Sequence, residues 1–591
     1  MRHVPHAAAV VAGVLFLSAW VPISANDTLQ GAGASAQVAN STAHRHTVWR
    51  TADANDTEFD STDEETVQEI SAKVIQPISA ALMGIMLLAA MLERLGISWI
   101  PESVVIIAAG AICGFALRHW ELLSIHALLE VNAPIVNLAC LPIIIFESGF
   151  SLRQKDFVAQ FPHILIFAVL GTIVSMGIVG GLIYATGELH GVRDLRTAFT
   201  FASLIAATDP VATLSTYSSL SVDPLLHILV FGESTINDAV AIVVFGVMNS
   251  EEVWGPSWAT HVPPVSEVWS AVLCGVVQKL SGSIFIGVGL GVLYTLALKC
   301  GDMRHAHSLE ILFILISCYL TFATAECAGM SGIIAALFCG IFMGIYAKPH
   351  LSGQGSVLAE FFLKQVATIG DMTVFLLVGI DIILVNSASV CFSLWLMLFC
   401  LVARGVAIGL CGVLSNSLKS AIAGKRKVEL PLTWKHLLMM WHAGLRGGIA
   451  LVLCLEMGDW VDMRGEPGTK QELINATIVV IAVFLIVFGG TTAMSLRALG
   501  IPTGMKVDEG YLYDRSLITC AQRCLHSLHH RWLAPILFPS DSEALQAMQC
   551  ETVEPLRKVM ADILQRSRGH YWFRARGASE YSSSEEEEFD D

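Results

Sequence analysis

The residues best suited to chemistry lie inside an apolar stretch, "VFGESTINDAVAIVVF" (residues 230–245), whose composition predicts a membrane-buried helix. It contains two carboxylates, Glu233 and Asp238, and one amide, Asn237. An ionised side chain at the centre of a bilayer costs about 2.5–3.5 kcal/mol on insertion scales. Two acidic residues this close together in such a helix therefore indicate an ion-binding or proton-binding role.

Helical geometry separates the two carboxylates. At about 100° per residue, Ser234 and Asp238 share one face of the helix, and Glu233 and Asn237 share another. Glu233 and Asp238 are about 140° apart, so they cannot both face one small cavity. We expect Asp238 to be a site ligand and Glu233 to be paired with an arginine.

Two arginines are candidates for that pair. Arg404 is the lone charge in the middle of the apolar stretch "CLVARGVAIGL", which makes it the first choice of partner for Glu233. Arg446 is the second choice.

Two other apolar segments carry helix-breaking residues. "AATDPVAT" contains Thr208, Asp209 and Pro210, and a proline inside a helix removes a hydrogen bond and clashes with the preceding turn. "WHAGLRGGIAL" surrounds Arg446 with three glycines, which loosen a helix. Proline and glycine are common in membrane helices. An acid in one break and a base in the other nevertheless indicate that the breaks have a function. Paired interruptions of this kind point to a transport site.

These residue types suit a hard cation and a proton. Asp238, Asp209, Ser234, Thr208 and the carbonyl groups freed by the breaks offer oxygen ligands to Na⁺ or K⁺. A low-dielectric cavity favours the protonated form of a carboxyl group. Proton and cation would then compete for one carboxylate, which is the chemical basis of exchange.

The composition predicts the frame that positions these groups. Of 591 residues, 54% are hydrophobic and only 15% are charged, whereas a soluble protein carries about 25% charged residues. The fold class is therefore an all-α polytopic membrane protein with 13 transmembrane helices, two inverted repeats and discontinuous crossing helices at positions 5 and 12. The apolar segments lie near residues 74–93, 100–117, 133–150, 161–187, 195–216, 225–249, 269–299, 308–327, 331–347, 357–384, 390–414, 434–456 and 473–494.

Four regions follow along the chain. Residues 1–25 predict a signal peptide, with an uncleaved signal anchor as the alternative. Residues 26–70 form an acidic luminal or extracellular segment with glycosylation candidates Asn26, Asn40 and Asn55. Residues 71–500 are the membrane domain, and its lysine-rich and arginine-rich loops predict a cytosolic C-terminus. Residues 501–591 are a short cytosolic tail with an acidic end.

The tail holds a predicted amphipathic helix over residues 517–532. It suits the membrane surface, a calcineurin-like helix-binding partner, or packing beneath the membrane domain itself. The nearby cluster of Cys520, Cys524 and three histidines fits no common zinc spacing. No cofactor and no nucleic-acid partner are expected.

These motifs resemble the eukaryotic sodium/proton exchanger family of monovalent cation/proton antiporters, over about residues 75–500. The resemblance rests on "LPIIIFESGFSL", "ATDPVATL", "HILVFGESTINDAV" and "AGLRGGIAL", in family order and spacing. "FESG", "ATDP" and "MWHAGLRGG" are more similar to the endosomal and Golgi branch than to the plasma-membrane branch.

The resemblance implies a homodimer with elevator-like alternating access and electroneutral exchange of one Na⁺ or K⁺, or Li⁺, for one H⁺. It implies that Asp238 binds the ion and proton with Asn237 beside it, and that Asp209 and Thr208 lie where the two broken helices cross. It also implies a buried pair of Glu233 with Arg404, and a crossing stabilised by Arg446.

This chain departs from the family pattern in two places. Ile143 stands where the family usually has a second proline, which bears on amiloride-type inhibition. The tail is far shorter than in the plasma-membrane members.

Other classes fit less well. An intramembrane aspartyl protease also buries two acids, but "TIGDM" around Asp371 lacks the required first glycine. A cation channel or a transport-inactive sensor could keep the same fold, and a flux assay separates either from an exchanger.

Overall fold

The computed structural model describes most of the predicted membrane domain. It describes residues 78–91, 102–119, 136–152, 154–209, 211–250, 265–301, 303–385, 387–423, 431–464 and 468–505, and the single residues 76, 94, 254, 512 and 537. The predicted signal peptide, the three glycosylation candidates (Asn26, Asn40 and Asn55), Pro210 and the cysteine and histidine cluster of the tail lie outside these residues. Residues up to 91 and residues from 92 onward form two units. The first contains the short apolar helix Ile78–Met91.

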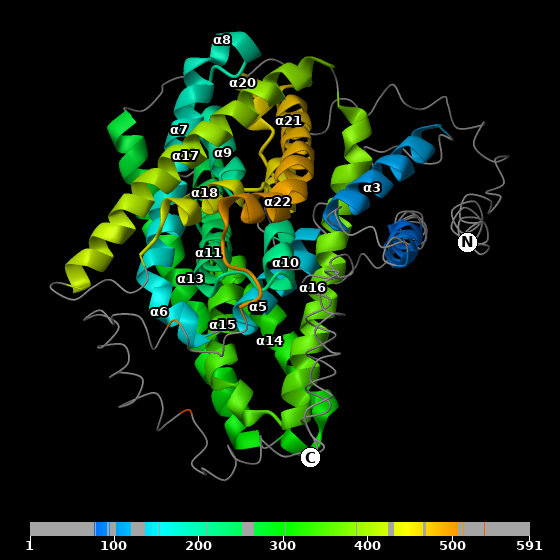
Figure 1. Ribbon diagram of the computed structural model, residues 1–591, viewed down its shortest axis with the longest axis vertical. Coiled ribbons are helices and arrows are strands. Elements are labelled where there is room, and N and C mark those ends of the chain that lie inside the picture. The colour runs from blue at the N-terminus through cyan, green and yellow to red at the C-terminus, as the bar shows by residue number, and fades with distance from the viewer. Residues whose placement is uncertain are drawn as a thin grey trace, which may run out of the picture. The chain divides into compact units, whose positions relative to one another are not determined.

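All regular structure in the described part of the second unit is helical (Figure 1). The elements are α3 (Glu102–His119), η1 (Val136–Cys140), α5 (Leu141–Phe150), α6 (Gln154–Leu165), η2 (Ile166–Leu170), α7 (Gly171–Ala185), α8 (Gly187–His190), α9 (Leu195–Ile205), α10 (Val211–Ser219), α11 (Pro224–Asn249), α13 (Val265–Gly301), η3 (Met303–His305), α14 (His307–Cys327), α15 (Gly332–Tyr346), η4 (Lys348–His350), α16 (Gly353–Asp381), η5 (Ile382–Leu384), α17 (Ser387–Ala423), α18 (Trp434–His442), α19 (Gly448–Leu455), α20 (Trp460–Arg464), α21 (Thr469–Phe484), η6 (Leu485–Gly489) and α22 (Gly490–Leu499).

Seven helices of the described residues are long and apolar enough to cross a membrane, and five shorter apolar helices accompany them. A polytopic all-helical membrane protein is thereby confirmed, whereas the count of 13 spans and the inverted repeats stay predictions. Two long spans contain a π-helical turn: η2 joins α6 to α7, and η6 joins α21 to α22. Such turns are frequent near functional sites in helices.

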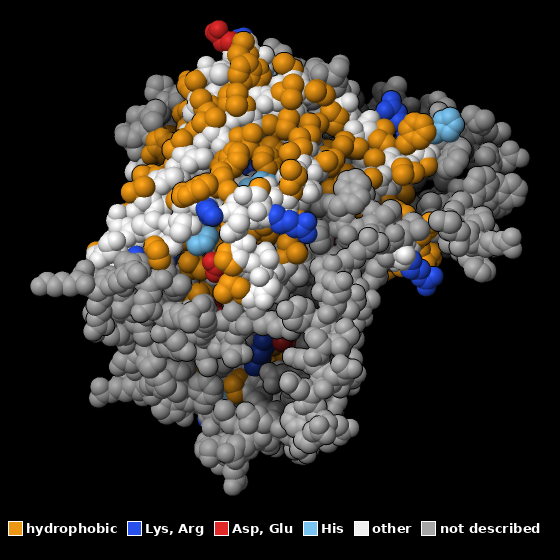
Figure 2. Space-filling view, viewed as in Figure 1, with side chains coloured by type: hydrophobic (Ala, Val, Ile, Leu, Met, Phe, Trp, Pro, Cys, Tyr) orange, Lys and Arg blue, Asp and Glu red, His pale blue; other side chains and the backbone are white. Residues whose placement is uncertain are grey.

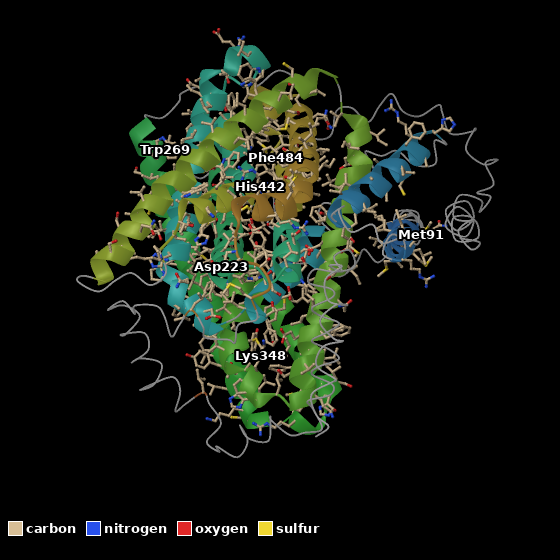
Figure 3. All side chains as sticks on the ribbon, in the orientation of Figure 1. Met91, Asp223, Trp269, Lys348, His442 and Phe484 are labelled. Carbon is tan, nitrogen blue, oxygen red and sulfur yellow. The ribbon has the colours of Figure 1, made fainter. Side chains whose placement is uncertain are left out.

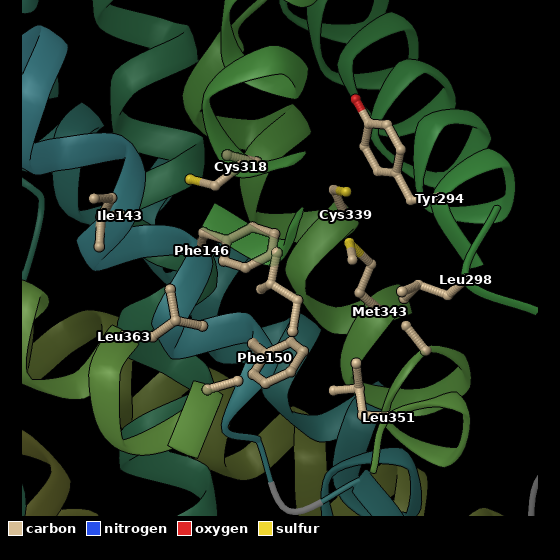
Figure 4. Close-up of a cluster of buried hydrophobic side chains, with 14 of the residues drawn as sticks. Ile143, Phe146, Phe150, Tyr294, Leu298, Cys318, Cys339, Met343, Leu351 and Leu363 are labelled. Carbon is tan, nitrogen blue, oxygen red and sulfur yellow. The ribbon is translucent and has the colours of Figure 1, made fainter. Parts of the chain in front are cut away.

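One group of helices packs around a shared apolar core. The core takes Phe146 and Phe150 from α5, Cys318 from α14, and Cys339 and Met343 from α15 (Figure 4). Glycines of α15 let the backbones of α5 and α15 approach closely, because a Cβ at Gly340 would collide with the Phe146 carbonyl oxygen. Small residues at such contacts are how membrane helices gain van der Waals packing.

The surface of the helices is apolar where lipid would lie. Figure 2 shows hydrophobic side chains over the upper part of the view, where Figure 1 places α17 and α21. On α17, exposed large side chains recur at helical spacing, among them Leu394, Leu398, Val402 and Val406. A face of this kind suits contact with acyl chains.

The central helix α11 has a well-defined start at Asp223 (Figure 3). The Asp223 side chain accepts a hydrogen bond from the Leu225 N–H at 3.0 Å, and Pro224 occupies the first helical position. Asp223 also lies 3.3 Å from Nε2 of His436, on the first turn of α18. His436 Nδ1 accepts from the Thr433 N–H, so Nε2 is the nitrogen that carries hydrogen toward Asp223. This contact joins the start of α11 to the start of α18.

We predict that Asp223→Ala lowers the stability of the folded protein by about 1 kcal/mol, the usual cost of losing an N-cap. Burial alone would raise the pKa of Asp223, but the hydrogen bonds from His436 and Leu225 and the imidazole charge outweigh burial and lower it. Because the folded-state pKa is depressed, the stabilisation is complete above the ordinary value of 3.8 and is lost as pH falls through the lowered pKa. Melting curves of detergent-solubilised Asp223→Ala and unmodified protein, recorded from above pH 3.8 down through the lowered pKa, measure this loss of stabilisation.

The control is Asp223→Asn, which keeps an N-cap acceptor without a charge. Its melting temperature relative to Asp223→Ala should not change with pH, because neither side chain titrates. A deficit of Asp223→Ala relative to the unmodified protein that stays constant down to the lowest pH would contradict the role of the charge.

Two described tail residues contact the membrane domain. The Leu512 N–H donates to Asp156 of α6 at 3.0 Å. Leu537 packs against Phe342 and Tyr346 of α15. The tail therefore packs against the membrane domain at residues 512 and 537, and the three placements of the amphipathic helix stay open. The amphipathic stretch at 517–532 lies outside the described residues.

Candidate ion site

The two predicted breaks occur, and they meet. Helix α9 ends at Ile205 and α10 begins at Val211, while α18 ends at His442 and α19 begins at Gly448. The Asp209 N–H donates to the Leu445 carbonyl at 3.1 Å, across the two breaks. The label positions in Figure 1 place α9, α10, α11 and α18 together in the middle of the view.

Arg446 holds the crossing together. Its Nη1 donates to the carbonyls of Ala206 and Ala207 at 3.0 and 3.2 Å, and its side chain is buried. These carbonyls lost their helical partners when α9 ended, so Arg446 satisfies groups that would otherwise be unpaired in a low-dielectric setting. The charge also lies at the C-terminal end of α9, where the helix dipole favours a cation.

Helix α11 is tied to the first break through Thr208. Ser234 Oγ donates to the Thr208 carbonyl at 2.8 Å, and Asn237 Nδ2 donates to Thr208 Oγ1 at 3.3 Å. Both bonds are buried. They place the face of α11 that carries Ser234 and Asp238 against the crossing.

Asp238 is buried on α11 and interacts electrostatically with Asp209 in the break. Among the described residues, no side chain or backbone group makes a hydrogen bond to the Asp238 carboxylate. The neighbouring Asn237 Oδ1 is also buried and, within the same residues, accepts no hydrogen bond. A carboxylate and an amide oxygen without donors, close to a second carboxylate, form a set of oxygen ligands suited to a bound cation or proton.

The carbonyls freed by the breaks already have donors within the protein. Those of Ala206, Ala207, Thr208 and Leu445 each accept a hydrogen bond from a protein donor. The physical reason is that an unpaired carbonyl is costly inside a membrane, so Arg446, Ser234 and a backbone N–H occupy these groups first. Each carbonyl keeps a second lone pair, so its role as a further cation ligand stays a prediction.

Glycine at the second break allows Asp209 to approach. A Cβ at Gly447 would occupy the space of the Asp209 side chain. Asp209 is half-buried at this position. The glycine run next to Arg446 thus serves close contact with the carboxylate as well as the break itself.

Glu233 faces away from Asp238, toward Arg404 of α17. Arg404 Nη1 donates to Glu233 Oε1, and Nη2 donates to the Met440 carbonyl of α18 at 3.0 Å. Both side chains are buried. The pair ties α11 and α17 to the end of α18, and Gly444 leaves room for the Arg404 side chain.

Sequence reasoning missed Asp371 of α16, which was weighed only as a protease residue. It interacts electrostatically with Asp209, Lys364 and Glu147. A lysine seven residues before an aspartate in one apolar helix was the available signal, because that spacing puts both on one face. No group of three or more His, Cys, Asp or Glu among the described residues could hold a resident metal ion.

Comparisons with known proteins place the chain in a family. Residues 78–498 match the family model described as "Sodium/hydrogen exchanger, transmembrane". The chain is 34% identical to sodium/hydrogen exchanger 8 of Mus musculus over 420 residues, which cover 70% of this chain and 69% of that protein. It is 31% identical to sodium/hydrogen exchanger 5 of Arabidopsis thaliana over 418 residues, which cover 69% and 76%.

A solved structure shares the fold. The sodium proton antiporter MjNhaP1 from Methanocaldococcus jannaschii aligns with a TM-score of 0.52 at 17% identity, covering 76% of this chain and 99% of that one. These matches support Na⁺/H⁺ exchange, and they do not favour a channel or a transport-inactive sensor. With crossed broken helices and a family model that matches residues 78–498, the chain belongs to the sodium/hydrogen exchanger family.

Proposed function

We propose that this protein is a secondary antiporter in which Asp238 alternately binds a proton and an alkali cation, Na⁺ or K⁺. The observation that supports this most is the buried Asp238 carboxylate, which has no hydrogen bond among the described residues and lies beside Asp209 and the free Asn237 Oδ1. A buried anion in this state needs a proton or a cation to offset its charge.

The exchange follows from that competition. Cation binding at Asp238 and Asp209 displaces the proton, and proton binding releases the cation. Ser234, Thr208 and Asn237 hold α11 against the crossing, so the ligands move with the broken helices as one group. The transport of cation and proton is coupled if this group of ligands moves between the two sides of the membrane only when Asp238 is occupied.

We predict a stoichiometry of one cation for one proton, with no net current. Asn237 cannot carry a proton, and Glu233 is bound to Arg404, which leaves Asp238 as the alternating group. The test imposes a Na⁺ gradient on proteoliposomes holding the purified protein and a pH-sensitive dye. The voltage is clamped with K⁺ and valinomycin, after K⁺ has been excluded as a substrate.

Proton flux should be independent of the clamped voltage. A flux that changes steeply with voltage, or a steady current on a solid-supported membrane, would mean that Asp209 or Glu233 also carries protons. Current without a coupled pH change would instead indicate a channel. Na⁺, K⁺ and Li⁺ gradients imposed in turn determine the preferred cation.

The finer architecture also belongs to this proposal. We infer 13 spans in two inverted repeats over residues 71–500, because the breaks of α9–α10 and α18–α19 are seven predicted helices apart. We further infer a homodimer, an N-terminus that is luminal after a signal peptide, and a cytosolic tail that could take a calcineurin-like partner. "FESG" and "MWHAGLRGG" support endosomal or Golgi membranes over the plasma membrane.

A further inference from the structure

A row of charged side chains follows one face of α16. Glu360, Lys364 and Asp371 lie within about 40° of one another around the helix, at the 100° per residue of an α-helix. All three lie in a span long and apolar enough to cross a membrane. Charged groups in such a span are costly and generally face a protein interior or a water-filled path. We therefore expect the row to have a function.

The outer part of the row begins near Lys348, in the lower half of Figure 3. Lys348 Nζ lies 3.6 Å from Glu360 Oε2, and Lys364 Nζ lies 3.8 Å from Glu147 Oε2 of α5. Side-chain exposure is 22% at Lys348, 28% at Glu360 and 23% at Lys364, and it drops to 7% at Glu147, while Asp371 is partly exposed. Because a charge facing lipid is unfavourable, these partly exposed charges and their link to the buried Glu147 indicate a polar route into the protein.

The inner part of the row reaches the ion site by direct packing. A Cβ at Gly448 would collide with the Val374 side chain of α16, while a Cβ at the adjacent Gly447 would collide with Asp209. The first turn of α19 therefore touches Val374 and Asp209 at neighbouring residues. Asp371 lies one turn before Val374 on α16, which brings it near Asp209 independently of any electrostatic argument.

The charges that act on Asp371 come from four elements. They are Asp209 in the break, Lys364 on its own helix, Glu147 on α5 and Glu102 on α3. Lys364 is the one cation in this set; it pairs with Glu147, and Asp371 follows two turns later on the same face of α16. Beyond Asp371, the buried Asn237 Oδ1 has no donor among the described residues and supplies a free acceptor next to Asp238.

We propose that Asp371 is an intermediate station for the alkali cation, between the Lys364–Glu147 pair and the Asp238 site. Lys364 acts as a tethered counter-cation that offsets the inner carboxylates when no transported cation is on the route. The proposal rests on the function proposed above and assigns Asp371 the role of setting apparent cation affinity. Asp238 alone exchanges the cation for a proton.

The test measures Na⁺-driven proton flux against Na⁺ concentration, with the full-length purified protein in proteoliposomes. Asp371→Asn should raise the apparent KM for Na⁺ about tenfold, as expected for losing one nearby charge in a partly hydrated site, with the maximal rate within about twofold. Asp371→Glu keeps the charge and should have the KM of the unmodified protein. Lys364→Met should lower it, because the competing cation is gone.

Thr373→Val is the matched control. Thr373 lies about 160° around α16 from Asp371, and its hydroxyl bonds only within its own helix, to the Ile369 carbonyl. Its kinetics should equal those of the unmodified protein. An unchanged KM in Asp371→Asn, or a raised KM in both Asp371→Asn and Lys364→Met, would overturn the station.

If Asp371→Asn fails to fold, the KM of Lys364→Met tests the role of Asp371. A merely structural Lys364–Glu147 pair predicts a lower melting temperature without a lower KM, which also counts against the station. Asp238→Asn in the same assay distinguishes the two proposals. If it is inactive while Asp371→Asn is unchanged, the station alone is wrong. If it retains full exchange, the proposed function of Asp238 is wrong.

Discussion

Proteoliposomes that contain the Asp238→Asn protein should show Na⁺-driven pH changes no larger than protein-free liposomes. Asparagine keeps the shape of aspartate and can still bind through oxygen, but it cannot carry a proton or neutralise a cation. In the structure the Asp238 carboxylate interacts with the Asp209 charge and makes no hydrogen bond among the described residues. Substitution therefore removes no bond of that kind, and the protein should fold. Its melting temperature should be equal or higher, because a buried charge is lost.

The matched control is the same substitution at Asp459, whose side chain is 88% exposed and pairs with Lys470 at the surface. Asp459→Asn should exchange at the normal rate. Full exchange by Asp238→Asn in vesicles with equal protein content would rule out Asp238 as the alternating group. A loss of exchange together with a lower melting temperature would point instead to a folding defect.

Hydropathy alone placed the elements well, because apolar length and composition decide which segments can enter a membrane. The predicted stretch 225–249 lies within the helix Pro224–Asn249, and 308–327 lies within His307–Cys327. The breaks could also be predicted, since a proline in one apolar segment and a glycine cluster in another act locally. These signals need no knowledge of which helices are neighbours.

The exact end of α9 could not be predicted from local signals. The helix ends at Ile205, several residues before the predicted break at Pro210. Arg446 and Leu445, from the other broken helix, take the backbone groups of Ala206, Ala207 and Asp209. The early end thus depends on hydrogen bonds that exist only after the two breaks have met, which the sequence of either segment does not contain.

The charged row of α16 shows the same limit. Lys364 and Asp371 share a face by helical spacing, which is a local property. Their partners Glu147 and Asp209 come from α5 and from the break after α9. Asp371 therefore looked like an isolated acid in the sequence, and its connection to the ion site follows only from the packing of Gly447 and Gly448.

The second large effect is expected at the buried pair of Glu233 and Arg404. Either Glu233→Gln or Arg404→Ala should lower stability by about 3–5 kcal/mol, because the remaining partner stays charged in a buried position. Arg404→Ala should be the more damaging, since it also leaves the Met440 carbonyl of α18 without its donor. Transport should fall in both variants, because the pair links α11 to the end of the second broken helix. Melting temperature in detergent and exchange in proteoliposomes measure the two effects.

A double-mutant cycle separates the pair from the rest of the site. The variant with both Glu233→Gln and Arg404→Ala carries neither charge, so it should be more stable than the sum of the two single losses predicts, by an interaction energy of about 1–3 kcal/mol. Arg404→Lys should recover only part of the stability, because one ammonium group cannot reach Glu233 and Met440 with the planar fork that the guanidinium uses. Additive losses in the cycle would show that the two charges do not depend on each other. The orientation of Glu233, about 140° around α11 from Asp238, would then not be explained by its pairing with Arg404. The voltage dependence of exchange would test whether Glu233 carries protons itself.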